Sequence, residues 1–319
     1  MPDMMTHAFL ALDVLKNIEN NEIIKNNKEL FLIGAQGPDP YFYYNFYPWK
    51  NSNNIPAFGG VMHKTKTRKF FVTYLEYLSK NFSDEGLAFI LGWICHYALD
   101  TNAHPYVFHV TGIYDGSKET RKYRGNHLAL EKGIDSIFLK ERGYDSNKYN
   151  PAKEIFTLES IPESVTNILD LTIFKVHQVI DMGVIYNQGY LDFKKSINIL
   201  QYDPFGMKKF LYKVLDLFNK KSAYVYKTLS YHNNVLSNID YLNIKKKEWK
   251  HPSSLEISNE TFNELYSKAI EKATFMIDQT IKYLDDNNID IEELFDNLSY
   301  ETGKDCELKL EIIHFNSIL

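Results

Sequence analysis

Cysteine is scarce in this chain, with two residues in 319. Two cysteines cannot build a disulfide scaffold or a four-cysteine zinc module, so both classes are excluded. Positive charge is not in excess either, because 36 lysines and arginines face 41 acidic residues and leave a net charge of −5. Gripping duplex nucleic acid usually requires a broad basic face, so we do not expect that partner.

Long apolar runs are also missing. The richest stretch, GLAFILGWICHY at residues 86–97, is much shorter than the ~20 residues of a membrane span. The beginning of the chain, MPDMMTHAFLALDVLKN, lacks the basic region, the apolar core and the small-residue cleavage site of a secretory leader. We therefore expect a cytoplasmic protein without a transmembrane segment.

Apolar residues recur every three or four positions over most of the chain, which is the spacing of an amphipathic helix. This pattern predicts helices over residues 4–17, 61–78, 84–102, 126–141, 162–189, 205–236 and 259–285. Ser83 is the expected N-cap of the third helix and Pro105 its expected stop. No long stretch alternates with period two, so little strand is expected. The whole chain, 1–319, is predicted to be one all-α domain, with residues 240–319 as a C-terminal extension.

Ten histidines are present, and they are unevenly spread. His96 and Asp100 are four residues apart, and His104 follows four residues later. His127 and Glu131 have the same spacing on the next predicted helix. Two side chains four apart share one helix face, about 6 Å apart at Cβ, so both can reach one ion. Three more candidate ligands lie earlier in the chain: His7, Asp39 and His63.

An ordinary buried hydrogen bond between histidine and aspartate is the rival explanation for such a pair. The helix that carries His96 and Asp100 is otherwise apolar, FILGWICHYALD, and burying both groups without a partner would be costly. A metal ion is a natural partner, and imidazole with carboxylate suits zinc without any thiolate. The remaining isolated histidines are expected to be surface or core residues: His177, His232, His251 and His314.

Together these motifs are recognisable. HYALDTNAHP, preceded by His7, GPD and His63 and followed by HLALE, resembles the zinc-dependent phospholipase C family. That family shares a multi-helical fold and a trinuclear zinc site with the single-strand-specific zinc nucleases. The resemblance covers residues 1–135 and implies the same all-α fold with up to three zinc ions.

The resemblance implies a ligand set for each ion. The first zinc would be held by Asp39, His63, His96 and Asp100, and the second by His104, His127 and Glu131. Asp100 would bridge to a third zinc, completed by His7 and by the amine and carbonyl of the first residue. With Met1 removed, that residue is Pro2, five positions before His7 as in the nucleases.

One position departs from the family pattern. Where the secreted phospholipases have a histidine six residues after the HxxxD aspartate, this chain has Tyr106. His104 and His109 flank it, and both remain candidates. We favour His104, because the proline that follows it is expected to keep it near the cluster.

The resemblance also implies an activity, hydrolysis of a phosphodiester such as a phospholipid, with Asp39 orienting or deprotonating the attacking water. A phospholipid would give diacylglycerol and a phosphorylated head group. Two other functions stay open: a single-strand nuclease with the same metals, and a non-catalytic protein in which zinc staples helices together.

Overall fold

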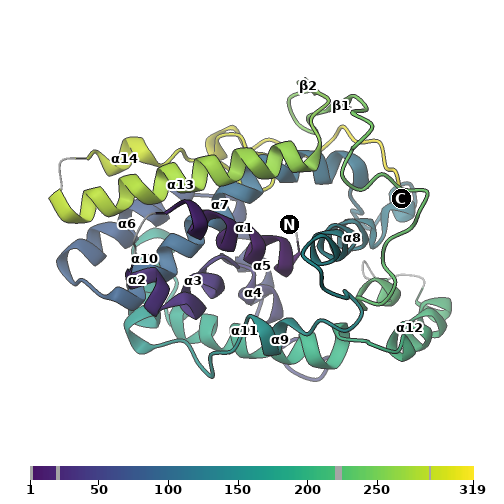
Figure 1. The fold of residues 1–319 in the computed structure, drawn as a ribbon, viewed down its shortest axis with the longest axis horizontal. Helices are drawn as coiled ribbons and strands as arrows, with labels where there is room; N and C mark the ends of the chain where they lie inside the picture. Colours follow the sequence, from purple (N-terminus) through teal and green to yellow (C-terminus); the bar gives the residue numbers. More distant parts are fainter. Residues whose placement is uncertain (1–2, 19–21, 220–224, 287–288) are drawn as a thin grey trace.

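The structure is a computed structural model that describes residues 3–18, 22–219, 225–286 and 289–319. Helices dominate it, and the described residues contain one small sheet, in which β1 (Trp249–Lys250) pairs antiparallel with β2 (Ile257–Ser258). The all-α prediction is therefore confirmed. The α-helices, labelled in Figure 1, are α1 Met4–Asn17, α2 Glu22–Asn26, α3 Lys28–Gly34, α4 Pro40–Tyr43, α5 Ile55–Lys64, α6 Thr67–Lys80, α7 Asp84–Thr111, α8 Asn126–Glu141, α9 Pro151–Glu154, α10 Glu163–His177, α11 Met182–Ser196, α12 Met207–Phe218, α13 Phe262–Asp286 and α14 Ile291–Leu294.

Short helical pieces complete the described chain. Three are 3-10 turns and one is a π-helical turn at the end of α11. They are η1 Arg121–Tyr123, η2 Ile197–Gln201 (the π turn), η3 Tyr226–Thr228 and η4 Cys306–Leu308. Among the described helices, none combines the length and the apolar character that a membrane span needs.

Helix α7 is the central element of the fold. It runs for 28 residues and is buried on almost every side, with α3 and α13 packed along it. Paired glycines let α3 and α7 touch backbone to backbone: a Cβ on Gly34 would lie 2.0 Å from the Phe89 carbonyl oxygen, and one on Gly92 would lie 2.0 Å from that of Phe31. This close approach brings the turn after α3 against the middle of α7.

The predicted stop at Pro105 is wrong, because α7 continues through it to Thr111. Proline cannot donate to the carbonyl four residues earlier, here that of Thr101, and so costs one helical hydrogen bond. Burial on both sides of the proline, at His104 and Tyr106 for example, holds the helix together in spite of that loss.

Three other predicted helices are also corrected. Residues 61–78 belong to two helices, α5 and α6, because Lys66 adopts a left-handed conformation with φ 56°. Residues 162–189 divide into α10 and α11 at Gln178 and Asp181, which also have positive φ. In the stretch 205–236, the described α-helix is α12 alone, and η3 follows as a single turn.

The C-terminal part of the chain packs into the same core. Helix α13 lies along α7 and α1 (Figure 1), with Phe262, Ala269 and Ile277 buried. Beyond α14, Phe295 stacks on Phe71 of α6 with ring centroids 4.4 Å apart, and Tyr300 is buried beside α7. The single-domain prediction stays a prediction, but residues 262–300 contribute directly to the surroundings of the site described next.

Candidate metal centre

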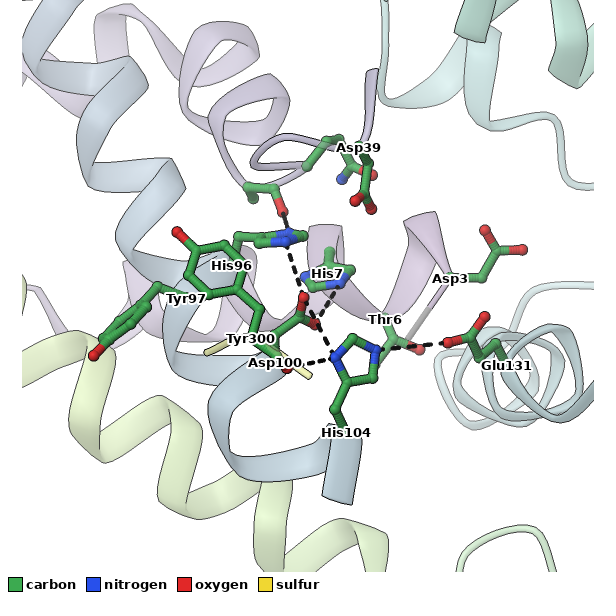
Figure 2. A network of polar contacts seen from close by, with 12 residues as sticks. Asp3, Thr6, His7, Asp39, His96, Tyr97, Asp100, His104, Glu131 and Tyr300 are labelled. Atoms are coloured by element: carbon green, nitrogen blue, oxygen red, sulfur yellow. Dashed lines mark hydrogen bonds and ion pairs between the residues drawn. The ribbon is translucent and has the colours of Figure 1, made fainter. Parts of the chain in front are cut away.

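Histidines and carboxylates from α1, the turn before α4, α5, α7 and α8 come together around the middle of α7. Figure 2 shows His7, Asp39, His96, Asp100, His104 and Glu131 of this set. The side chains form three groups, and within each group the potential ligand atoms lie within 4.8 Å of one another. Two of the groups share His96, and the third includes His104, about two helical turns further along α7. They are Asp39, His63 and His96; His7, His96 and Asp100; and His104, His127 and Glu131.

The first group joins the turn after α3 to α5 and α7. The Nε2 atom of His63 lies 3.2 Å from the Asp39 Oδ1 atom. Gly37 has φ +50°, and a Cβ there would lie 2.4 Å from the His96 ring. Only glycine therefore lets the chain pass this close to His96 while placing Asp39 two residues later.

The second group lies deeper, between α1 and α7. The Asp100 carboxylate has His7 Nε2 at 3.3 Å from Oδ1 and His96 Nε2 at 3.0 Å from Oδ2. The two imidazole rings stack with centroids 4.2 Å apart. His104 Nδ1 also lies 3.7 Å from Asp100 Oδ2, so this carboxylate stands between three histidines.

The third group connects α7 to α8 and lies closest to solvent. His127 Nε2 is 2.8 Å from Glu131 Oε1, and His104 Nε2 is 3.9 Å from the same oxygen. The side chain of His127 is 32% exposed, whereas those of His104 and Glu131 are buried. The centre is thus most open on the side of α8.

Backbone carbonyls orient three of the histidine rings. The Nδ1 atoms of His63, His96 and His104 each lie within hydrogen-bond distance of a carbonyl oxygen. Since a carbonyl only accepts, Nδ1 carries the proton and Nε2 presents its lone pair to the centre, as in many metal sites. The carbonyls are those of Gly59, Ala35 and Tyr300, at 2.7, 3.3 and 2.6 Å.

Several polar atoms of the centre are buried and make no hydrogen bond of normal geometry within the described part of the chain. They belong to His7, Asp39, His96, Asp100 and His104. Buried polar atoms are nearly always satisfied in folded proteins, so this concentration calls for a partner. Imidazole nitrogens and carboxylate oxygens are ligands that zinc accepts, and the residues therefore fit a zinc cluster.

Burial shifts the pKa values of the centre in a consistent direction. It lowers the pKa of His7 to about 4, with His96 adding to the effect, and it also lowers the pKa of His63 and His104. These imidazoles are therefore neutral at pH 7 and free to bind a metal. Burial likewise raises the pKa of Asp39 well above its usual value, so a nearby cation is needed to keep this carboxylate ionised.

Asp100 makes the same requirement clearer. Burial opposes its ionisation, but positive charge on His104, His96 and His7 would outweigh burial and hold the pKa of Asp100 well below its usual value. At least His7 and His104 are neutral at pH 7, because their own pKa values are lowered. A bound cation would therefore stabilise the Asp100 carboxylate in a way that these neutral imidazoles do not.

The structure brings together eight of the nine residues proposed as ligands, all those listed in the three groups above. The ninth, Pro2, lies outside the described residues. His109 is turned away: its ring lies 6.3 Å from that of Trp249, and it lines a separate cavity of about 450 Å³ with His314. Tyr106 is also elsewhere, with its hydroxyl donating to the Tyr241 carbonyl at 3.0 Å.

Sequence reasoning missed Tyr300, which braces two candidate ligands at once. Its amide donates to the His63 carbonyl at 2.8 Å, and its carbonyl accepts from His104 Nδ1. Its hydroxyl accepts from Trp93 Nε1 at 3.1 Å, and its ring lies edge-on to that of His63. No spacing rule connects residue 300 to residue 104, so the sequence held no signal for this role.

A second missed feature is a buried network that ties the start of α1 to α8. Asp3 accepts from Lys132 Nζ and from the Tyr231 hydroxyl, both at 2.7 Å. Asp135 accepts from the backbone amide of Thr6 at 2.8 Å, and its Oδ2 atom lies 2.7 Å from the same Tyr231 hydroxyl. Burial raises the pKa of Asp135 to about 7, and the nearby Asp3 adds to the effect. The spacing Glu131–Asp135 continues the four-residue series on α8 and could have suggested this role.

The comparisons with known proteins bear on this centre directly. A family model described as zinc dependent phospholipase C matches residues 6–178, a segment that contains all eight candidate ligands in the described chain. No curated protein and no solved structure matches the chain. Because the family match covers more than half of the residues, the chain belongs to the zinc-dependent phospholipase C family.

Proposed function

We propose that the protein is a phospholipase C that uses up to three zinc ions to hydrolyse a phospholipid. At the level of the family, the match and the three groups of ligands already support a zinc-dependent hydrolase of phosphodiesters. The observation that carries the finer proposal is the set of buried, unsatisfied nitrogen and oxygen atoms around Asp100. Their number and their spread over three groups of ligands support a multinuclear site rather than a single ion.

The proposed ligand assignment follows the three groups. Asp39 and His63 join His96 at the first ion, and His104 joins the α8 pair at the second. Asp100 would be shared between ions, because its Oδ1 atom faces His7 and its Oδ2 atom faces His96 and His104. His7 completes the innermost position beside it.

Zinc in such a site supplies Lewis-acid chemistry, making water more acidic and stabilising negative charge on the phosphate. Asp39 would accept the proton of the attacking water. In support of this role, its side chain is 13% exposed, while its Oδ1 atom is buried and lies 3.2 Å from His63 Nε2. The water oxygen forms a bond to phosphorus, the bond from phosphorus to the glycerol oxygen breaks, and that glycerol oxygen takes up a proton. Diacylglycerol and a phosphorylated head group are the products.

The test is a substrate comparison on zinc-loaded protein, with a chromogenic phosphocholine ester, phospholipid vesicles and single-stranded DNA. We expect turnover of the ester and the vesicles. Cleavage of the DNA alone would make the protein a nuclease, and zinc binding without any turnover would make the metal a structural staple.

The Asp39→Asn variant tests the assigned proton acceptor. It should retain most of the zinc, because the other ligands remain, and lose on the order of 100-fold in turnover, a typical effect of general-base removal. Glu29→Gln, which neutralises an exposed carboxylate on α3, is the matched control and should behave as the wild type. Unchanged turnover in Asp39→Asn would remove this residue from the mechanism, and complete loss of zinc would make it a structural ligand.

A further inference from the structure

Helix α12 and the residue before it present an apolar face to solvent. Six large side chains between residues 205 and 218 are each 54–82% exposed: Phe205, Met207, Phe210, Leu211, Leu217 and Phe218. At 100° per residue, those of α12 lie on one side of the helix. Contiguous exposed apolar surface of this kind marks a site of contact with a protein or a membrane.

The polar side of α12 faces the protein, the reverse of an ordinary surface helix. Lys208, Lys209, Tyr212 and Asp216 all bind backbone groups of the surrounding chain. These groups are the carbonyls of Asn198, Asn233 and Leu200 and the amides of Tyr226 and Lys227. Because these bonds fix the rotation of the helix, the apolar face is held outward.

Helix α12 is also connected to the open side of the metal centre. Arg124 Nη2 donates to the Asn219 carbonyl at 2.9 Å, just beyond the end of α12. Val225 packs closely on Gly125, the N-cap of α8: a Cβ added to Gly125 would lie 2.7 Å from the Cβ atom of Val225. His127, the most exposed candidate ligand, follows two residues later. In Figure 1, α12 projects at the end of the molecule beyond α8.

Exposed basic residues lie on α12 and on the segments next to it. The loop before α8, residues 113–125, has four basic residues against two acidic ones, and Arg121 and Lys122 in it are exposed. Lys213 and Lys227 are exposed on and beside α12. An apolar helix face with a basic border is complementary to a lipid surface, whose acyl region takes up the apolar side chains while its phosphates attract the lysines and arginines.

We propose that residues 205–218 dock on the surface of a phospholipid bilayer and so hold the open side of the metal centre against the lipid head groups. This inference rests on the proposed function, since a phospholipase must meet its substrate at such a surface. The basic border favours bilayers that contain anionic lipid, while the apolar face supplies the part of the binding that salt does not screen.

The experiment is co-sedimentation of the full-length, zinc-loaded protein with vesicles of equal parts phosphatidylcholine and phosphatidylglycerol. An Asp39→Asn background keeps the vesicles intact during the measurement. The triple variant Phe205→Ser, Phe210→Ser and Phe218→Ser should bind vesicles at least about ten-fold more weakly, because three exposed rings no longer enter the lipid. Phe275→Ser, at a site 60% exposed on α13, is the matched control and should bind as its parent does.

Turnover of the soluble phosphocholine ester, measured without the Asp39 change, separates this inference from the proposed function. The triple serine variant should hydrolyse the ester as fast as the wild type. Selective loss of vesicle binding supports docking even if the ester is never hydrolysed. Equal binding by the triple variant, no binding by its parent, or a dimer that the three serines dissociate without any vesicle binding would each overturn the proposal.

Discussion

Gly303→Ala offers a sharp test of how the C-terminal segment supports the metal centre. Gly303 has φ +61°, and a Cβ there would lie 2.2 Å from the carbonyl oxygen of Thr101 in α7. Pro105 cannot donate to that carbonyl, so the glycine packs directly on the oxygen. Its amide also closes a turn with Ser299 at 2.8 Å, which ties its position to that of Tyr300.

The geometry sets the size of the disturbance. Cβ atoms essentially never approach another atom within 3.0 Å, so the gap of 2.2 Å must open by at least 0.8 Å. If the turn moves as a unit, the bond from His104 Nδ1 to the Tyr300 carbonyl lengthens from 2.6 Å to about 3.4 Å, near the limit of a hydrogen bond. Loss of such an orienting partner typically weakens metal binding by about 10–100-fold.

The assay is a chelator competition that measures zinc affinity, together with thermal unfolding of the same samples. Gly143→Ala is the matched control: its φ of +82° imposes similar backbone strain, but nothing lies within 4 Å of the added Cβ. Both variants should lose some stability, and Gly303→Ala alone should bind one zinc more weakly. A folded Gly303→Ala protein with zinc affinity equal to that of Gly143→Ala would refute the reasoning.

Two further predictions concern α7 and α8. His104→Ala should lower the zinc content by about one ion per chain, and His109→Ala should leave it unchanged. Metal analysis of the purified proteins measures both, and equal losses of zinc would contradict the assignment of His104 as the ligand. Asp135 keeps a proton up to a pKa of about 7 in the folded chain but only to about 3.8 when unfolded, so its contribution to stability is present below pH 4 and is lost as the pH rises through 7. We therefore expect the free energy of unfolding in urea, measured on chelator-treated protein, to differ less between wild type and Asp135→Asn at pH 7 than at pH 4, by roughly 1–3 kcal/mol. A difference that does not change with pH would mean that Asp135 does not hold this proton.

The parts of the candidate site that follow local rules were predictable from the sequence. His96 and Asp100, and likewise His127 and Glu131, are four residues apart on single helices, so helical geometry alone brings each pair together. Their order along the chain, with the turn that carries Asp39, was specific enough to indicate the family.

The rest depends on contacts between distant segments, which spacing does not reveal. Tyr300 reaches His104 across 196 positions, and Tyr231 reaches Asp3 across 228. The orientation of α12 was equally hidden. Its apolar periodicity predicted a helix, but a periodic pattern does not say which side meets the protein, and here the hydrogen bonds of Lys208 and Asp216 reverse the usual choice.

His104 was preferred over His109 as a ligand for a reason that the structure contradicts. Its choice over His109 relied on Pro105 ending the helix, yet α7 continues to Thr111. The geometry of that unbroken helix discriminates between them more strongly. At 100° per residue, His104, four residues after Asp100, lies only 40° from it around the helix axis. His109, nine residues after Asp100, lies 180° from it, on the opposite side of the helix. If Pro105 ended the helix, helical geometry would not fix the positions of the two histidines relative to Asp100. Because the helix continues through Pro105, only His104 lies on the same face as Asp100.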